Sequence, residues 1–337
     1  MLRAKAHEFR SGKLAHPVRD RMLSSTDRNG RLATIPIVVH VVNGAARSKP
    51  LRAIGEKVMA VDKDAWVPRF APRPFRSHAA KSAGHAVKDG ERSPGKVAIF
   101  ATCYVNYNEP AVGHDLLKIL DHNAIPYVLA GKEACCGMPK LEQGDLESVA
   151  ALKEKNIPRL AKLAREGYAI VTPVPSCTLM YKQELPLMFP EDEDVRAVRD
   201  AMFDPFEYLM ARKRDGLLKT DFKNALGKIA YHIPCHSRVQ NMGQKTREAL
   251  ELVPGTELNV VERCSGHDGT WGVKEEYFAN SMKIGRPVFR QMAQGEPDYV
   301  SSDCPIAARH IMQGMAGDAG KAVKAHPLTL FRKAYGV

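Results

Sequence analysis

The chain has 337 residues, of which 44% are hydrophobic and 26% are charged. These fractions are ordinary for globular proteins, and the length allows two domains and an extension. No apolar run approaches the roughly 20 residues needed to cross a bilayer, and residues 1–22 lack the apolar core of a secretory signal. We therefore expect a cytoplasmic protein, either free or on the cytoplasmic face of the membrane.

The formal net charge of +12 lies wholly in the N-terminal third. Residues 1–100 contain 20 Lys and Arg against 8 Asp and Glu, so residues 101–337 are neutral overall. Such a segment suits nucleic acid, an anionic membrane face or an acidic protein partner. Few aromatic residues are available to stack on bases and no nucleic-acid motif is present, so we expect no nucleic-acid partner.

Residues 1–95 are predicted to form a mostly helical, basic N-terminal extension. A short apolar stretch at 35–42 precedes a helical pattern at 51–61. The composition then changes to Pro, Arg, Ala, Ser and Gly over residues 68–94, which is typical of a linker. We place the domain boundary near residue 95.

Two segments with the same order of elements follow. In the first, apolar runs predict strands at 96–102, 126–130 and 169–174, with helices around 116–120 and over 145–166. In the second, strands are predicted at 228–233, 257–261 and 299–300, with helices around 246–252 and over 275–292. The sequence thus predicts an α/β protein with two tandem parallel-sheet modules, at 96–181 and 228–337, joined by a helical connection at 182–227.

All seven cysteines follow residue 102, and each lies at or just after a predicted strand end. They are Cys103, Cys135, Cys136 and Cys177 in the first half and Cys235, Cys264 and Cys304 in the second. An odd number of cysteines in a cytoplasmic chain argues against a disulfide framework. Metal binding or redox chemistry is the better expectation, because ligands gather beyond the carboxyl ends of parallel strands.

The adjacent pair Cys135 and Cys136 indicates which chemistry to expect. Their α-carbons lie about 3.8 Å apart, short of the roughly 4.4 to 6.8 Å usual for a disulfide. Two neighbouring thiolates before Gly137, which permits close approach, suit iron atoms. Zinc is an alternative, although its structural sites usually contain C-x2-4-C pairs, which are absent here. Ordinary buried core cysteines are the other alternative.

The pattern Cys135-Cys136-Gly137, repeated as Cys264-Ser265-Gly266, resembles the duplicated cysteine-rich CCG domain. Cys103, Pro175-Ser176-Cys177, Cys235 and Cys304-Pro305 complete the resemblance over residues 96–315, and the stretch from Cys264 to Gly272 is similar to the glycerol-3-phosphate dehydrogenase branch. The family includes the B subunit of heterodisulfide reductase, the C subunit of anaerobic glycerol-3-phosphate dehydrogenase and the iron-sulfur subunit of glycolate oxidase. The resemblance implies electron transfer through iron-sulfur clusters.

The chain departs from the fullest family motif, which ends in C-x-x-C and supplies five cysteines. Met180 and Ala307 stand at the last position of the two halves. The first half keeps four cysteines, enough for a 4Fe-4S cluster, with Met180 at best a weak extra ligand. The second half keeps three, so a second cluster there is the less certain of the two and would have one open iron for a substrate, a histidine or Ser265.

His236 and His267 follow two cysteines of the second half. Either could ligate iron, but hydrogen bonding within the loops or beside the cluster is the expectation we favour. Asp268 and Arg238 are expected to satisfy loop backbone or to pair with each other. No residue is assigned a catalytic role.

The family pattern normally includes a ferredoxin-like module before the duplicated domain, and this chain has no cysteine before Cys103. Residues 2–36 nevertheless resemble the stretch that follows that module, so the basic extension is expected either to dock an acidic ferredoxin or flavoprotein or to be a solvated tail. The resemblance implies a non-flavin iron-sulfur subunit of an oxidoreductase complex. It would relay electrons between a flavin dehydrogenase for glycerol 3-phosphate, glycolate or a similar hydroxy compound and a quinone or other acceptor, with peripheral membrane association through the complex.

A second hypothesis makes the protein a cluster-free thiol or disulfide reductase of the heterodisulfide type, in which Cys135 and Cys136 react directly. Reactive cysteines need a depressed pKa, which nearby positive charge provides. Lys132 and Lys140 flank the pair and could supply it.

Overall fold

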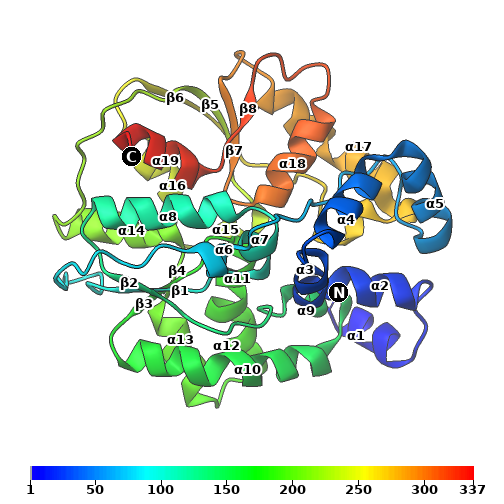
Figure 1. The fold of residues 1–337 in the computed structure, drawn as a ribbon, viewed down its shortest axis with the longest axis horizontal. Coiled ribbons are helices and arrows are strands. Elements are labelled where there is room, and N and C mark those ends of the chain that lie inside the picture. The colour runs from blue at the N-terminus through cyan, green and yellow to red at the C-terminus, as the bar shows by residue number, and fades with distance from the viewer. Residues whose placement is uncertain (1) are drawn as a thin grey trace.

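The computed structural model describes residues 2–337 and contains two four-stranded parallel sheets (Figure 1). The strand orders are β2-β1-β3-β4 in the first sheet and β6-β5-β7-β8 in the second. The two orders are the same when the second set is renumbered from β5, so the internal repeat is a repeat of topology. The predicted α/β architecture with two parallel-sheet modules and a helical N-terminal region is confirmed.

The first sheet consists of short strands at the centre of the first module. These are β1 (Val97–Ile99), β2 (Tyr127–Leu129), β3 (Ala169–Val171) and β4 (Met202–Phe203). β1 and β3 are fully buried and rich in β-branched residues, as strands covered on both faces are. Helices α8 (Pro110–His122) and α14 (Pro205–Arg214) cover one face, and α10 (Leu146–Arg165) and α13 (Glu193–Ala201) cover the other (Figure 1).

Shorter helices connect these elements and carry the strand-end loops. They are α7 (Cys103–Tyr107), α9 (Met138–Gln143), α11 (Pro175–Leu179), the π-helix η1 (Met180–Glu184) and α12 (Leu185–Met188). A π-helix is rare and often accompanies a functional site. Here it directly follows the helix that contains Cys177.

The second sheet has longer strands and the same crossovers. Its strands are β5 (Gly227–His232), β6 (Thr256–Val261), β7 (Tyr299–Ser302) and β8 (Val323–Lys324). Its helices are α15 (Cys235–Arg238), α16 (Lys245–Leu250), the 3-10 turn η2 (Trp271–Val273), α17 (Glu275–Met292), α18 (Pro305–Gly314) and α19 (Pro327–Tyr335). The fourth strand of each sheet was not predicted, because strands of two residues show no periodicity. β4 lies within the segment expected to be a helical connection and pairs with β3.

The two modules pack directly on each other. Helix α19 lies against α8, and α11 lies against α15. Arg332 Nε bonds Asp115 Oδ1 at 2.6 Å, and Lys324 Nζ bonds both carboxylate oxygens of Glu109 at 2.6 and 2.7 Å. Asp115 lies in α8 and Glu109 directly precedes it, so both ion pairs join the first module to the C-terminal part of the second. These contacts hold the two modules together.

The N-terminal extension folds into helices that pack on both modules. They are α1 (Leu2–Arg10), α2 (Pro17–Ser24), α3 (Thr26–Ala33), α4 (Val38–Arg47), α5 (Lys49–Met59) and α6 (Phe75–His78). α1 and α2 pack on α9, and α3 packs on α7, so these helices lie beside the strand-end loops of the first module (Figure 1). No helix within residues 2–337 is both long and apolar enough to span a membrane.

A buried ion-pair cluster fixes the extension to the second module. The Arg19 guanidinium, 3% exposed, donates to both carboxylate oxygens of Glu276 at 2.7 and 2.8 Å, to Asp20 at 2.8 Å and to the carbonyl of Ala60 at 3.1 Å. Lys274 Nζ lies 3.0 Å from the same Asp20 carboxylate. The alternative of a solvated basic tail does not describe this part of the extension.

The segment expected to be a linker, residues 68–94, follows the surface of the first module in irregular backbone apart from the short helix α6. Phe75 is fully buried, and the Tyr208 hydroxyl donates to the carbonyl of Pro94 at 2.7 Å. Ser93 Oγ donates to Asp215 at 2.5 Å, and Arg212 donates to the carbonyl of Lys88 at 2.7 Å. Side chains of α14 and of the residue after it therefore hold the end of this segment in place.

Candidate functional site

Four cysteines of the first module converge from three strand ends. Cys103 begins α7 directly after β1, Cys135 and Cys136 end the loop after β2, and Cys177 lies in α11 after β3. Cys135, Cys136 and Cys177 are buried and Cys103 is half-buried. None of the four is in a disulfide. The first module therefore brings together the four residues that the sequence predicted for it.

The backbone around the β1 end is strained where it turns into the site. Thr102 has a positive φ of 64°, uncommon for a residue with a branched side chain, and its hydroxyl accepts a hydrogen bond from Val105 N at 3.2 Å as the cap of α7. Ala101 N donates to Glu133 Oε1 at 3.0 Å, which ties this turn to the loop of the adjacent cysteines. Strain of this kind concentrates at functional sites.

Asn156 of α10 holds the loop that contains Cys135. Its amide oxygen accepts from Ala134 N at 2.9 Å, and its amide nitrogen donates to the carbonyl of Cys135 at 3.1 Å. Gly137, with φ of 101°, then starts α9, a conformation that favours glycine. The methyl of Met180 lies 3.4 Å from where a side chain at Gly137 would begin, so Met180 packs at the site without being a fifth thiolate.

The four sulfurs form a chain of contacts. Hydrogen bonds from the thiols of Cys103 and Cys136 lower the pKa of Cys135 well below its usual value, and Cys136 in turn interacts with Cys177. The same hydrogen bonds, with burial, raise the pKa of Cys103 and of Cys136. Within residues 2–337 no three His, Cys, Asp or Glu side chains are arranged as ligands of a single metal ion. The arrangement instead brings four cysteine sulfurs to one site of the fold, and each would become a thiolate on binding iron.

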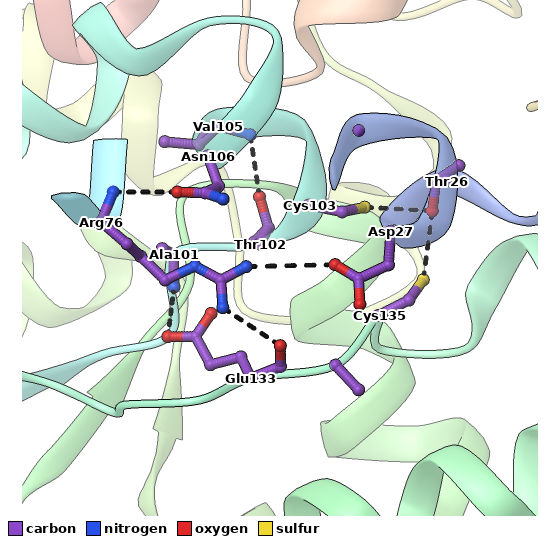
Figure 2. A network of polar contacts seen from close by, with 12 residues as sticks. Thr26, Asp27, Arg76, Ala101, Thr102, Cys103, Val105, Asn106, Glu133 and Cys135 are labelled. Atoms are coloured by element: carbon purple, nitrogen blue, oxygen red, sulfur yellow. Dashed lines mark hydrogen bonds and ion pairs between the residues drawn. The ribbon is translucent and has the colours of Figure 1, made fainter. Parts of the chain in front are cut away.

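Thr26 also belongs to this site, although it lies 77 residues before Cys103. Its hydroxyl lies 3.3 Å from Cys103 Sγ and donates to Cys135 Sγ at 3.4 Å (Figure 2). Sequence reasoning missed it, because no motif surrounds it and only the packing of α3 on α7 brings it to the sulfurs.

Two buried polar groups beside the cysteines are unsatisfied. The Tyr181 hydroxyl and Glu133 Oε2 have no hydrogen-bond partner within residues 2–337, although Tyr181 is only 1% exposed. The pKa of Tyr181 is raised well above its usual value by burial and by the nearby Cys136 and Cys177. Buried polar groups rarely stay unpaired, so they suit a site completed by a polar group. Four thiolates together with these groups fit an iron-sulfur cluster.

The three cysteines of the second module are less buried than those of the first. Cys235 and Cys264 are exposed, and their hydrogen bond lowers the pKa of Cys235 to about 5, with Arg238 adding to the effect. The same bond raises the pKa of Cys264. Cys304 is half-buried and starts α18, where its sulfur accepts from Ala307 N at 3.5 Å, and burial raises its pKa to about 11. The carboxylates that act on Cys304 are those of Asp303 and Glu142.

Two of the polar residues near Cys235, Cys264 and Cys304, namely Arg238 and His267, contact other side chains. Arg238 donates to Cys235 Sγ at 3.3 Å and to Glu262 at 3.4 Å, and is not paired with Asp268 as one sequence expectation had it. The ring of His267 packs edge-on against His310, with centroids 5.4 Å apart, and burial lowers the pKa of His267 to about 3. Burial also lowers the pKa of His236. Ser265 is buried.

The two cysteine sets lie close to the same interface between modules. α11, which contains Cys177, packs on α15, which begins with Cys235. Glu142 of α9 lies against Gly269 in the loop after Cys264, where an added Cβ would meet Glu142 Oε2 at 2.1 Å. A single short helix thus runs from the Cys135-Cys136 pair to the loop of the second set.

Comparisons with known proteins agree with this duplicated arrangement. Residues 97–182 and 229–309 each match the family described as "Cysteine-rich domain" (CCG). The chain is 30% identical over 323 residues to the C subunit of the anaerobic glycerol-3-phosphate dehydrogenase of Escherichia coli, covering 94% of this chain and 77% of that protein.

Two further proteins are also similar. The B subunit of the fumarate reductase (CoM/CoB) of Methanothermobacter marburgensis is 27% identical over 231 residues, covering 67% of this chain and 43% of that protein. An uncharacterized iron-sulfur protein of Methanocaldococcus jannaschii is 28% identical over 222 residues, covering 65% of this chain and 42% of that protein. With two matched cysteine-rich domains on two repeated sheets, the chain belongs to the duplicated cysteine-rich (CCG) domain family.

Proposed function

We propose that the chain is the non-flavin iron-sulfur subunit of an oxidoreductase complex and transfers electrons through a cluster in its first module. The observation that supports this most directly is the convergence of four cysteines on one buried site, from three strand ends of a parallel sheet. The sulfurs contact one another in sequence, and polar groups beside them lack partners among the described residues. The relatives named as iron-sulfur protein and as dehydrogenase or reductase subunits point the same way.

Cys103, Cys135, Cys136 and Cys177 would hold a 4Fe-4S cluster, which supplies one-electron chemistry when bound. The protein's own contribution is to bury the sulfurs and to hold their loops with Asn156 and the Thr102 turn. Cys235, Cys264 and Cys304 would form a second site with only three thiolates. Two of these sulfurs are exposed, and Asp303 and Glu142 act on Cys304. Both features favour the view that the second site is a diverged copy of the first site.

The partner proposed for this subunit is a flavoprotein dehydrogenase that oxidises glycerol 3-phosphate, glycolate or a similar hydroxy compound, with a quinone or other acceptor downstream. A ferredoxin-like protein could serve as the other partner. The protein would work in the cytoplasm, with peripheral membrane association through the complex. Support comes from the relatives that are subunits of a glycerol-3-phosphate dehydrogenase and of a fumarate reductase.

Helices α4 and α5 form the surface proposed to meet an acidic partner. Val41, Ile54 and Val58 are 65%, 57% and 73% exposed, so apolar side chains project from both helices. Residues 31–59 contain five Lys and Arg and one acidic residue, Glu56. Exposed apolar side chains in a segment with an excess of cations suit a partner with an acidic rim, because charge complementarity speeds encounter.

Electron paramagnetic resonance of the reduced, anaerobically purified protein tests the proposal. We expect a cluster signal in the wild type that disappears in Cys136→Ala and persists in Cys264→Ala. Loss in the first variant alone assigns one cluster to the first module, whereas loss in both shows that the two sets act together. An iron-free wild type without a signal would contradict the proposal.

A cluster-free thiol reductase that uses Cys135 and Cys136 is the second candidate. The depressed pKa of Cys135, which its two thiol neighbours cause, favours a nucleophilic thiolate. Burial of both sulfurs opposes it, since a disulfide substrate must reach them. Disulfide reduction by an iron-free preparation, abolished in Cys135→Ala, would establish this alternative.

A further inference from the structure

The hydroxyl of Thr26 is a contact to the first cysteine site from outside the cysteine-rich repeats. Thr26 Oγ1 lies 3.3 Å from Cys103 Sγ and 3.4 Å from Cys135 Sγ, distances typical of hydrogen bonds to sulfur. These two sulfurs come from different strand ends of the first module, so one side chain of the extension bridges two of the four thiolates.

Helix α3 is held so that this contact is fixed on the side of Cys103. α3 packs on α7, the helix that Cys103 begins. At Gly30, one turn after Thr26, an added Cβ would lie 2.2 Å from the ring of Tyr107 in α7. The two helices therefore approach as closely as glycine permits.

Arg76 fixes the same helix on the side of Cys135. Its guanidinium lies 4.0 Å from Asp27 Oδ1 in the first turn of α3 and donates to the carbonyl of Glu133 at 3.1 Å, two residues before Cys135 (Figure 2). Its backbone N–H donates to Asn106 Oδ1 of α7 at 2.8 Å. Arg76 thus links α3, α7 and the Cys135 loop.

The direction of the hydrogen bond follows from the chemistry of the sulfurs. A cysteine that binds iron is a thiolate and has no proton to donate, so Thr26 must be the donor. A donor stabilises the more negative, reduced state of a cluster more than the oxidised state, because hydrogen bonds to charged acceptors are stronger. Hydrogen bonds to the sulfurs are among the factors that set the potential of a cluster.

We propose that Thr26 is a positioning residue of the first cluster site, and that its hydroxyl raises the reduction potential by donating its one proton to the Cys135 thiolate while it lies against the Cys103 thiolate. The inference rests on the proposed function, since it needs a cluster at the first site. It adds a task for the N-terminal extension, which completes the environment of the site from outside the repeats.

The test compares Thr26→Val, which removes the hydroxyl at constant shape, with Thr26→Ser, which keeps it. Thr34→Val is the matched control, because it makes the same change in the residue that directly follows α3, where the hydroxyl donates to the carbonyl of Gly30 at 2.8 Å. Iron content and the midpoint potential, from a titration followed by electron paramagnetic resonance, are measured for each.

We expect Thr26→Val to bind iron but to lower the reduction equilibrium constant about tenfold, as loss of one charge-assisted bond would. That is a downward shift of about 59 mV for one electron. Thr26→Ser and Thr34→Val should match the wild type. Loss of iron from Thr26→Val alone would also support the contact, and Thr26→Ala provides a second measurement if the valine variant does not fold.

Full iron with an unchanged potential in Thr26→Val would overturn the inference while leaving the proposed function intact. An equal downward shift in Thr34→Val would overturn it as well, because the effect would then belong to α3 in general. A wild type without iron would instead refute the proposed function, and this inference with it.

Discussion

Arg19→Leu tests whether the extension is a fixed part of the molecule. The substitution removes four hydrogen bonds, leaves the Ala60 carbonyl without its donor and separates Glu276 from its cation. Breaking a fully buried pair costs about 3–5 kcal/mol. Glu276 is 35% exposed and Asp20 keeps Lys274 at 3.0 Å, so we expect a loss at the lower end, about 3 kcal/mol in the free energy of unfolding.

Urea unfolding measures this loss, and Arg21→Leu on the same helix is the control, because Arg21 is exposed. The control should change stability by less than about 0.5 kcal/mol. Limited proteolysis should also cut the first 60 residues faster in Arg19→Leu, since the carbonyl of Ala60 is one of the groups that Arg19 holds. Equal stability and equal cleavage in the two variants would refute the view that this cluster fixes the extension.

Two further predictions concern pH and charge. Burial lowers the pKa of His232 to about 4, so the unfolded state binds the proton first as pH falls from about 6.5 to 4. His232 should therefore contribute up to about 3 kcal/mol to the stability lost over that window, in addition to the buried His267, His310 and His326. His232→Gln should flatten this slope in urea unfolding, and an unchanged slope would exclude His232 as its cause. Lys57→Glu on α5 should slow reduction by an acidic ferredoxin at low salt, whereas the exposed Lys118→Glu on α8 should not. Equal rates in both variants would show that α5 does not meet the partner.

Three of the four strands in each sheet, and the place of the cysteines after them, could be predicted because each carries a local signal. β1 and β3 are apolar, β-branched runs, and the helix over 146–165 is capped by Asp145, whose carboxylate accepts from Ser148 N at 3.2 Å. The adjacent Cys135 and Cys136 before a glycine with positive φ are a pattern with few other uses.

The contributions of Thr26 and Tyr181 could not be predicted, because they depend on contacts between distant segments. The hydroxyl of Thr26 reaches sulfurs 77 and 109 positions later through the packing of α3 on α7. From the sequence alone Tyr181 is an ordinary core aromatic, and only the structure shows that its hydroxyl lies beside the cysteines with no partner among residues 2–337. The environment of Cys304, where Asp303 and Glu142 act on the sulfur, likewise depends on packing that strand-end spacing does not determine.

Iron and acid-labile sulfide analysis of the anaerobically purified wild type, beside Cys177→Ser, tests the central claim most directly. Cys177 is a buried member of the first set. The account predicts about four irons and as much sulfide per chain in the wild type, and a loss of about four irons in the variant. Fewer than about two irons in the wild type, or equal iron in the two proteins, would contradict a cluster held by the first module.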